Sequence, residues 1–250
     1  MENILEFNNV SLIYHSLNSE TLAIKKLDFN VQKGEFVAIV GPSGCGKTTI
    51  LSLISGIIKP SGGTIIRNTQ NDCGYMFQKD HLFNWRTIYK NITLGLELQK
   101  KNNTENIQYI KDLSNKYGIA EFLDRYPSQL SGGMRQRVAL IRTLALRPDI
   151  LLLDEPFSAL DFQTRLDVCD DVWKIIKSEE KTAILVTHDI HEAISMADRI
   201  IILSQRPAEV KKIVEVKLDK SLTPFKRREQ KGFLEYFDII WKELAYEEKS

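Results

Sequence analysis

The sequence has few cysteines and no long apolar run. Cys45, Cys73 and Cys169 are the only cysteines in 250 residues, and they lie far apart. This spacing predicts neither a disulfide framework nor a metal cluster, and it suits a reducing compartment. No apolar stretch approaches the roughly 20 residues that cross a bilayer, and we expect no signal peptide.

The sequence also lacks an excess of charge of either sign. Its net charge is +1, which gives no support for the broad positive field of a nucleic-acid-binding protein. We therefore expect no nucleic-acid partner. With 43% hydrophobic and 27% charged residues, the composition is ordinary for a globular protein with a substantial core.

A glycine-rich loop stands between a predicted strand (35–40) and a predicted helix (47–58). Its sequence fits the pattern Gly-x-x-x-x-Gly-Lys-[Ser/Thr], in which backbone N–H groups and the helix N-terminus bind nucleotide phosphates. Lys47 would bridge the outer phosphates, and the Thr48 hydroxyl can ligate Mg²⁺. An ordinary glycine turn is the alternative reading. The candidate ATP-binding residues are Gly41, Pro42, Ser43, Gly44, Cys45, Gly46, Lys47, Thr48 and Thr49.

Cys45 supports two readings. Beside Lys47 and the N–H groups of this loop, its thiol pKa would fall, and alkylation would block nucleotide binding. Alternatively, Cys45 is a small residue that fits the loop.

A carboxylate pair ends a second predicted strand, Ile150–Asp154. Ligands bind at the carboxyl ends of strands in open parallel sheets. Asp154 is therefore predicted to hold the Mg²⁺ shell, and Glu155 to orient or deprotonate the water that attacks the γ-phosphate. A surface turn beginning at Asp-Glu-Pro is the alternative.

A third segment offers a second anion site. Residues 130–137, here called the signature segment, read Leu-Ser-Gly-Gly-Met-Arg-Gln-Arg and open a predicted helix over 134–147 that Pro148 ends. Ser131, Gly132 and Gly133 would expose free N–H groups at the N-terminus of this helix. Ser131 can also act as a simple helix cap.

The sequence resembles the ATP-binding subunit of ABC transporters over nearly its whole length. The resemblance rests on motifs in the order of that family: the glycine loop, Gln78, the signature segment, Asp154-Glu155, residues 158–161 (Ser-Ala-Leu-Asp) and His188. The signature segment separates this family from other phosphate-loop ATPases.

The resemblance implies further roles. Tyr14 would stack on adenine, although a half-buried strand tyrosine is the alternative. Gln78 would touch Mg²⁺ and the attacking water, and His188 would contact the γ-phosphate. Two copies would pack head to tail around two ATP molecules, with each signature segment facing the nucleotide of the other copy and Asp161 coupling the two sites.

The predicted fold is α/β, with a P-loop NTPase core around a mainly parallel sheet, an N-terminal antiparallel β-subdomain and an inserted α-helical signature subdomain. The nucleotide-binding core would cover 1–78 and 149–220, the helical subdomain 79–148, and a helical tail 221–250. In the tail, an apolar stripe is expected to dock on the chain's own core, and its length predicts no regulatory β-domain. The stripe consists of Phe233, Leu234, Phe237, Ile240, Trp241 and Leu244.

The resemblance also implies membrane partners. In the family, the region after Gln78 receives a short helix of an integral membrane permease, so Leu82, Phe83 and Trp85 are candidate contacts; internal packing is the alternative. The protein would then lie peripherally on the cytoplasmic face of the membrane and serve a substrate-binding protein indirectly.

Several short sequences are similar to those of the nitrate, sulfonate, taurine and bicarbonate import group. They are the end of the signature segment (Met134-Arg-Gln-Arg), Trp85-Arg-Thr and a turn at 204–207 after the last strand. Asn84 and Ala208-Glu209 depart from that group. The substrate is therefore open, and an importer of pyrimidine vitamin precursors or aromatic compounds is an alternative. An ABC-type ATPase acting on nucleic acid or ribosomes, or a scaffold that binds nucleotide without turnover, are further alternatives.

Overall fold

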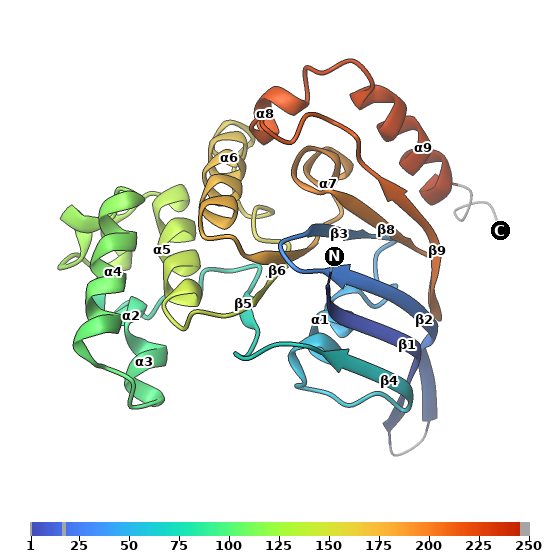
Figure 1. Ribbon diagram of the computed structural model, residues 1–250, viewed down its shortest axis with the longest axis horizontal. Coiled ribbons are helices and arrows are strands. Elements are labelled where there is room, and N and C mark those ends of the chain that lie inside the picture. Colours follow the sequence, from blue (N-terminus) through green and yellow to red (C-terminus); the bar gives the residue numbers. More distant parts are fainter. Residues whose placement is uncertain (1, 17–18, 246–250) are drawn as a thin grey trace.

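A computed structural model describes residues 2–16 and 19–245 (Figure 1). Strands and helices alternate along most of the chain. The strands are β1 (Asn3–Ser16), β2 (Ser19–Gln32), β3 (Phe36–Val40), β4 (Gly62–Arg67), β5 (Gly74–Met76), β6 (Ile150–Asp154), β7 (Thr182–Val186), β8 (Arg199–Leu203) and β9 (Ala208–Glu215). The α-helices are α1 (Lys47–Ser55), α2 (Ile88–Ile92), α3 (Leu94–Leu98), α4 (Thr104–Lys116), α5 (Gly132–Leu144), α6 (Phe162–Ser178), α7 (Ile190–Met196), α8 (Pro224–Arg227) and α9 (Phe233–Ala245).

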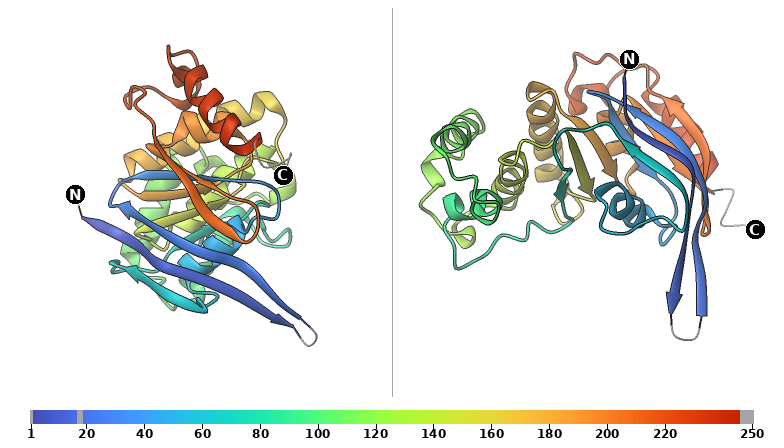
Figure 2. Two further views of the ribbon diagram at one scale, coloured as in Figure 1. Left: turned by 90° about the vertical axis from the view of Figure 1, so that its right-hand side faces the viewer. Right: turned by 60° about the horizontal axis from the view of Figure 1, so that its bottom comes forward.

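The strands form one mixed sheet in the order β4-β1-β2-β9-β8-β3-β7-β6-β5. From β8 to β5 the neighbours pair in parallel, whereas β1 pairs antiparallel with β2 and β4. The β1–β2 ribbon extends beyond the rest of the molecule (Figure 2). This arrangement confirms the predicted α/β fold with a mainly parallel core and an N-terminal antiparallel part.

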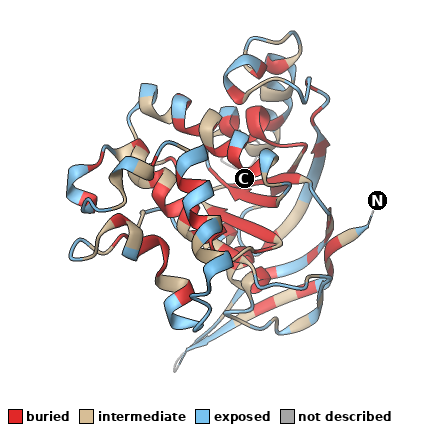
Figure 3. Cartoon of the chain, turned by 60° about the vertical axis from the view of Figure 1, so that its left-hand side comes forward, coloured by how far each residue is buried: buried red, intermediate tan, exposed pale blue. Residues whose placement is uncertain are grey.

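The central strands are buried on both faces (Figure 3). In β3, Phe36, Ala38 and Val40 belong to a hydrophobic cluster shared with α5, α6 and α7. Val37 and Ile39 belong to a second cluster, shared with α1, β1 and β2. Since successive side chains of a strand point to opposite faces, this double burial explains why the strand reads as a continuous apolar run.

Helices α2 to α5 follow β5 and precede β6, and they lie to one side of the sheet (Figure 1). They fall within the proposed helical subdomain, 79–148. Of the proposed tail, residues 246–250 lie outside the described residues.

Several predicted boundaries were wrong. Helix α1 ends at Ser55 because Gly56 takes the left-handed conformation, at φ 77°, and Ile57 beyond it is 68% exposed rather than on a buried helical face. Helix α5 begins at Gly132, since Ser131 caps it, and ends at Leu144. Residues 204–207 do not follow the last strand, because β9 pairs antiparallel with β8 beyond them.

Helix α9 docks on the core by a narrower stripe than predicted. Phe233 and Ile240 are buried, but Leu234 and Trp241 are 73% and 56% exposed. Positions 233, 237, 240 and 244 share one helical face, whereas 234 and 241 are rotated away by about 100° at 3.6 residues per turn. The inclusion of Leu234 and Trp241 in the buried stripe was therefore wrong.

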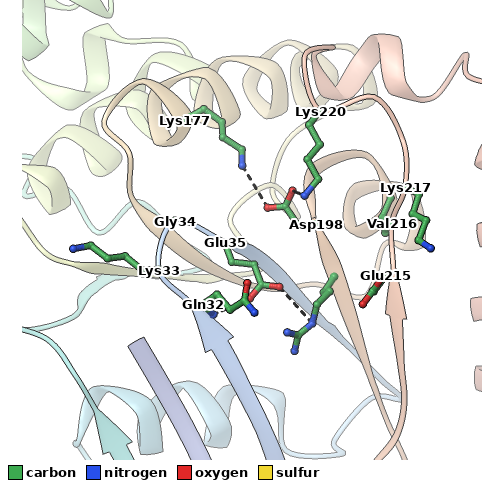
Figure 4. A pocket seen from close by; sticks show the side chains of 11 residues that line it. Gln32, Lys33, Gly34, Glu35, Lys177, Asp198, Glu215, Val216, Lys217 and Lys220 are labelled. Carbon is green, nitrogen blue, oxygen red and sulfur yellow. Dashed lines mark hydrogen bonds and ion pairs between the residues drawn. The ribbon is translucent and has the colours of Figure 1, made fainter. Parts of the chain in front are cut away.

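A pocket of about 460 Å³ lies where β3 and β8 begin, at the opposite end of these strands from the glycine loop (Figure 4). Asp198 lies 2.9 Å from Lys220 Nζ and 3.4 Å from Lys177 Nζ, and it accepts a hydrogen bond from the Phe36 N–H at 2.9 Å. Glu35 pairs with Arg199 at 3.4 Å. These ion pairs connect α6, β3, β8 and the segment after β9.

Candidate active site

The glycine loop, residues 41–46, follows the carboxyl end of the buried strand β3. Gly44 and Gly46 have φ values of 75° and 111°, which side chains with a Cβ rarely adopt. At Gly41, a Cβ would stand 2.8 Å from Cys45 Sγ and 3.0 Å from Leu203 Cβ. The loop therefore packs tightly against β8 and leads its backbone into the N-terminus of α1, where anions bind favourably.

Lys47 folds back across this loop. Its Nζ donates to the carbonyl oxygens of Gly41 at 2.8 Å and Pro42 at 3.0 Å, and the residue is only 8% exposed. The ammonium group thus lies at the loop, where an incoming anion would meet it.

Asp154 lies at the end of β6, beside the first turn of α1. The Thr48 hydroxyl donates to Asp154 Oδ1 at 3.3 Å, and the Tyr75 hydroxyl donates to Oδ2 at 3.0 Å. Burial raises the pKa of Asp154, and these two hydrogen bonds oppose that rise. Burial and the neighbouring Asp154 raise the pKa of Tyr75. Thr48 and Asp154 together offer a divalent cation two oxygen ligands.

Sequence reasoning missed Tyr75. Alternation along the strand 73–77 places the side chain of Tyr75 on the opposite face from that of Met76, but it does not point to Asp154 as the partner.

Two residues predicted to be catalytic, His188 and Gln78, lie beside one carboxylate oxygen of a third, Glu155. Glu155 Oε2 lies 3.2 Å from His188 Nδ1 and 3.5 Å from Gln78 Nε2. Gln78 Nε2 also donates to Ser158 Oγ at 3.1 Å, a contact the sequence did not predict. Glu155 has φ 45°, an uncommon conformation for a residue with a side chain. Such strain is typical of positions held for function.

Tyr14 reaches the edge of the loop from β1. Its hydroxyl lies 3.2 Å from Thr49 Oγ1, and the residue is 44% exposed. The ring is therefore accessible beside α1, where a base attached to loop-bound phosphates could stack on it.

The signature residues stand at the start of α5, which packs beside the edge strand β5 and belongs to the hydrophobic cluster on the other side of the sheet from that of α1 (Figure 1). Ser131 caps α5 by accepting a hydrogen bond from the Met134 N–H at 3.3 Å. Asp161 caps α6 by accepting from the Thr164 N–H at 3.1 Å, and hydrogen bonds from the Thr164 side chain and N–H lower the pKa of its carboxyl. Ser131, Gly132, Asp161 and Gln78 line one cleft of about 630 Å³. Residues 41–46 of the glycine loop do not line this cleft.

The predicted membrane contacts do not all lie at the surface. Leu82 is 8% exposed and belongs to the core, so its prediction as a surface contact was wrong. Trp85 is 75% exposed, and its ring lies 4.8 Å from that of the half-buried Phe83. Cys45 is 1% exposed, which favours its reading as a packed residue over that of an alkylation target.

Comparison with known proteins identifies the family. The family model "ABC transporter" matches residues 24–158, more than half of the chain. The chain belongs to the ABC transporter ATP-binding family. The members of this family are ATPases coupled to transport. No helix of residues 2–16 and 19–245 is long and apolar enough to cross a membrane.

Relatives match almost the full length of the ABC ATPase. The uncharacterized ABC transporter ATP-binding protein YtlC of Bacillus subtilis is 42% identical over 98% of this chain and 97% of its own. The nitrate import ATP-binding protein NrtD of a Synechocystis species is 35% identical over 94% of this chain and 93% of its own. A dimeric, post-hydrolysis structure of the ATP-binding cassette MJ0796 bound to ADP and Pi has a TM-score of 0.69 and 31% identity, covering 85% of this chain and 99% of its own.

Proposed function

We propose that this ABC ATPase hydrolyses ATP to drive import of a small anion through a separate permease. One observation carries the catalytic part: Glu155 Oε2 is 3.2 Å from His188 Nδ1 and 3.5 Å from Gln78 Nε2, at the carboxyl end of β6. A carboxylate in such a position can orient a water molecule and accept its proton as the water attacks the γ-phosphate. His188 would then contact the γ-phosphate oxygens.

The residues around the loop fit ATP with Mg²⁺. Backbone N–H groups of 43–48 would hold the phosphates, Lys47 would turn from the loop carbonyls to the outer phosphates, and Tyr14 would stack on adenine. Thr48, Asp154 and Gln78 offer oxygen atoms, the ligands that Mg²⁺ prefers. When bound, Mg²⁺ would neutralise charge on the β- and γ-phosphates.

Dimerisation would complete the site. Ser131, Gly132 and Gly133 open α5 on the opposite face of the sheet from the chain's own loop, so they are suited to the γ-phosphate held by a second copy. Asp161 lines the same cleft and would couple the two ATP sites. The dimeric structure of the similar cassette MJ0796 supports this arrangement.

Transport would need partners in the membrane. We propose that the chain lies peripherally on the cytoplasmic face and docks on a permease through Trp85 and Phe83. A separate protein would supply the substrate. Nitrate, sulfonate or taurine is the proposed class, supported by the similarity to NrtD and by the motifs around Trp85 and the signature segment.

The Glu155→Gln protein tests the catalytic assignment. The amide keeps the size of the side chain but cannot accept a proton, so we expect ATP binding to persist, steady-state hydrolysis to fall at least about 100-fold, and ATP to shift the protein to a dimer. Size-exclusion chromatography with ATP measures the dimer. Hydrolysis at the unmodified rate would overturn the assignment.

Affinity capture from native membranes tests the transport assignment. Recovery of a multi-span permease with a binding protein for small anions would support it. Ribosomal or DNA-associated partners without a permease would overturn it and leave the ATP chemistry intact.

A further inference from the structure

Glu192 is a buried carboxylate that the proposed mechanism does not use. It lies in the first turn of α7, four residues after His188, and is 3% exposed. The Thr187 hydroxyl donates to Glu192 Oε2 at 2.7 Å, and the Asp189 N–H donates to the same hydroxyl at 3.0 Å. The Glu192 carboxylate is thus hydrogen-bonded to Thr187 and, through the Thr187 hydroxyl, linked to Asp189; these are the two residues on either side of His188.

Arg165, on α6, faces the same carboxylate from the other side. Its Nε lies 4.0 Å from Glu192 Oε1, and its Nη1 lies 3.6 Å from Asp189 Oδ2. Within the described part of the chain, Nε is buried and has no hydrogen-bond partner. A shift of about 1 Å would bring Nε into hydrogen-bonding distance of Glu192.

The side chain and the backbone N–H of Arg165 also donate hydrogen bonds to the segment before α6. Arg165 Nη2 donates to the Leu160 carbonyl at 3.0 Å, and the Arg165 N–H donates to the Asp161 carbonyl at 2.9 Å. Leu160 and Asp161 line the cleft beside Ser131. One side chain therefore contacts both the segment that would face a second copy and the segment that carries His188.

We infer that Arg165 and Glu192 are positioning residues that transmit the placement of Leu160 and Asp161 to His188, an inference that rests on the proposed function. Movement of residues 160–161 against a second copy would pull the Leu160 carbonyl and, with it, the guanidinium group of Arg165. The Arg165–Glu192 contact would then close, and Glu192 would fix His188 through Thr187 and Asp189. Arg165 and Glu192 touch neither the nucleotide nor the water in this arrangement.

The charge state of Glu192 supplies a readout that packing alone would not. Burial raises the pKa of Glu192 to about 7, against the opposing hydrogen bond from Thr187. The charged and titratable groups facing it are Arg165 and Cys169 from α6, together with Asp189 and His188 from its own segment. Glu192 is ionised above this pKa, and only the ionised carboxylate attracts Arg165 strongly. The rate should therefore rise with pH through about 7.

Steady-state kinetics of the full chain with Mg-ATP test the inference. In the Arg165→Gln protein we expect kcat to fall at least about 10-fold while KM stays within about twofold, since the lost contact acts only on the chemical step. Arg165→Lys keeps the positive charge but lacks the planar guanidinium group with its several donors, so it should recover part of the rate. Unchanged kcat in a folded Arg165→Gln protein would overturn the inference, as would equal loss in the Lys and Gln variants.

Glu192→Gln keeps the size of the side chain and an oxygen that can accept the hydrogen bond from Thr187. This variant therefore tests the inference even if the Arg165→Gln protein does not fold. We expect its kcat to be several-fold below the wild type at pH 8, to approach the wild type at pH 6, and to lack the rise between them. A wild-type profile in the Glu192→Gln protein would overturn the inference.

Two controls separate this inference from the proposed function. Lys177→Gln breaks an ion pair of the same helix α6 with Asp198, outside the proposed ATP site, and should leave kcat within about twofold of the wild type. A tenfold loss in that variant would assign the Arg165 effect to general packing and overturn the inference. Glu155→Gln is measured in parallel: its full activity would overturn the catalytic assignment, whereas an inactive Glu155→Gln with an unaffected Arg165→Gln overturns only the positioning role.

Discussion

Lys47 closes the phosphate loop of this ABC ATPase by donating from Nζ to the Gly41 carbonyl oxygen at 2.8 Å. Nζ also donates to the Pro42 carbonyl oxygen at 3.0 Å, so the ammonium group satisfies two backbone acceptors of the loop. In the proposed function the same side chain would also bind the phosphates of ATP, and its roles in loop stability and in ATP binding can be measured separately.

Replacing Lys47 with Ala should weaken ATP binding and also destabilise the loop. We expect the Kd for ATP to rise at least about 10-fold, because a charge-assisted contact to phosphate is lost. Without nucleotide, the free energy of unfolding should fall by about 1–2 kcal/mol, since two carbonyl groups lose their donor. Calorimetric titration and urea unfolding measure these changes. Lys59→Ala, at an exposed lysine beyond α1, is the matched control, and an unchanged Kd for Lys47→Ala would contradict the assigned role.

Asp198 should make stability depend on pH in the acid range. Burial alone would raise the pKa of its carboxyl, but Lys220, the Phe36 N–H and Lys177 outweigh burial and lower it. A lowered folded pKa means that the contribution is complete above the unfolded value of about 3.9 and is lost as pH falls through the folded pKa.

The Asp198→Asn protein measures this contribution. At pH 7 we expect its free energy of unfolding to be about 1.5–3 kcal/mol below the wild type, because hydrogen bonds to a charged group are lost. The difference should vanish as pH falls through the folded pKa, below about 3.9. Asp167→Asn, at an exposed position of α6, should show little difference at either pH. A gap between Asp198→Asn and the wild type that persists below the folded pKa would refute the charge argument.

Gly133 allows α5 and α6 to approach closely. A Cβ at this position would stand 2.9 Å from Val168 Cγ2 and 3.4 Å from Thr164 Cγ2. Gly133→Ala should therefore destabilise the chain by about 1–3 kcal/mol, the usual effect of overpacking. In the Gly133→Ala/Val168→Ala protein the destabilisation should be less than the sum of the two single effects, because the clashing methyl group is gone. Thermal unfolding of the four proteins measures the coupling, and strict additivity would exclude the clash.

The chemistry of the site was easier to predict from sequence than its exact neighbours. Gly44, Gly46 and Lys47 form a local motif, so their arrangement follows from a few consecutive residues. Tyr75 was missed because its contact with Asp154 joins residues 79 positions apart, and a strand tyrosine carries no local mark of its partner. Ser158 was noted only within a motif, although its hydroxyl accepts from Gln78.

The strands could be predicted from continuous apolar runs where they are buried on both faces, as in β3. The apolar pattern did not predict which side chains are buried where only one face of a segment packs on the core. Leu234 and Trp241 match the apolar composition of α9 but not its buried face, and Leu82 lies in the core although its neighbour Trp85 is exposed. Composition over a short segment cannot separate these cases, because the direction of each side chain depends on how the helix or loop docks.

The exposure of Trp85 offers a direct test of permease docking. An indole that is 75% exposed, beside the half-buried Phe83, is costly to leave in water and is the kind of side chain that dominates protein interfaces. Trp85→Ala should reduce capture of the permease from native membranes at least about 10-fold, which corresponds to about 1.4 kcal/mol. ATP hydrolysis by the isolated chain should not change, because Trp85 lies outside the catalytic residues.

Trp241→Ala provides the matched control, since Trp241 is also an exposed tryptophan, 56% exposed, but lies on α9. It should leave capture intact if Trp85 acts through a specific site rather than through general surface hydrophobicity. Equal loss of capture in both variants would point to nonspecific adhesion to the membrane. Equal retention in both would show that Trp85 is not one of the residues that dominate permease binding, because truncating such a residue costs about 2 kcal/mol or more.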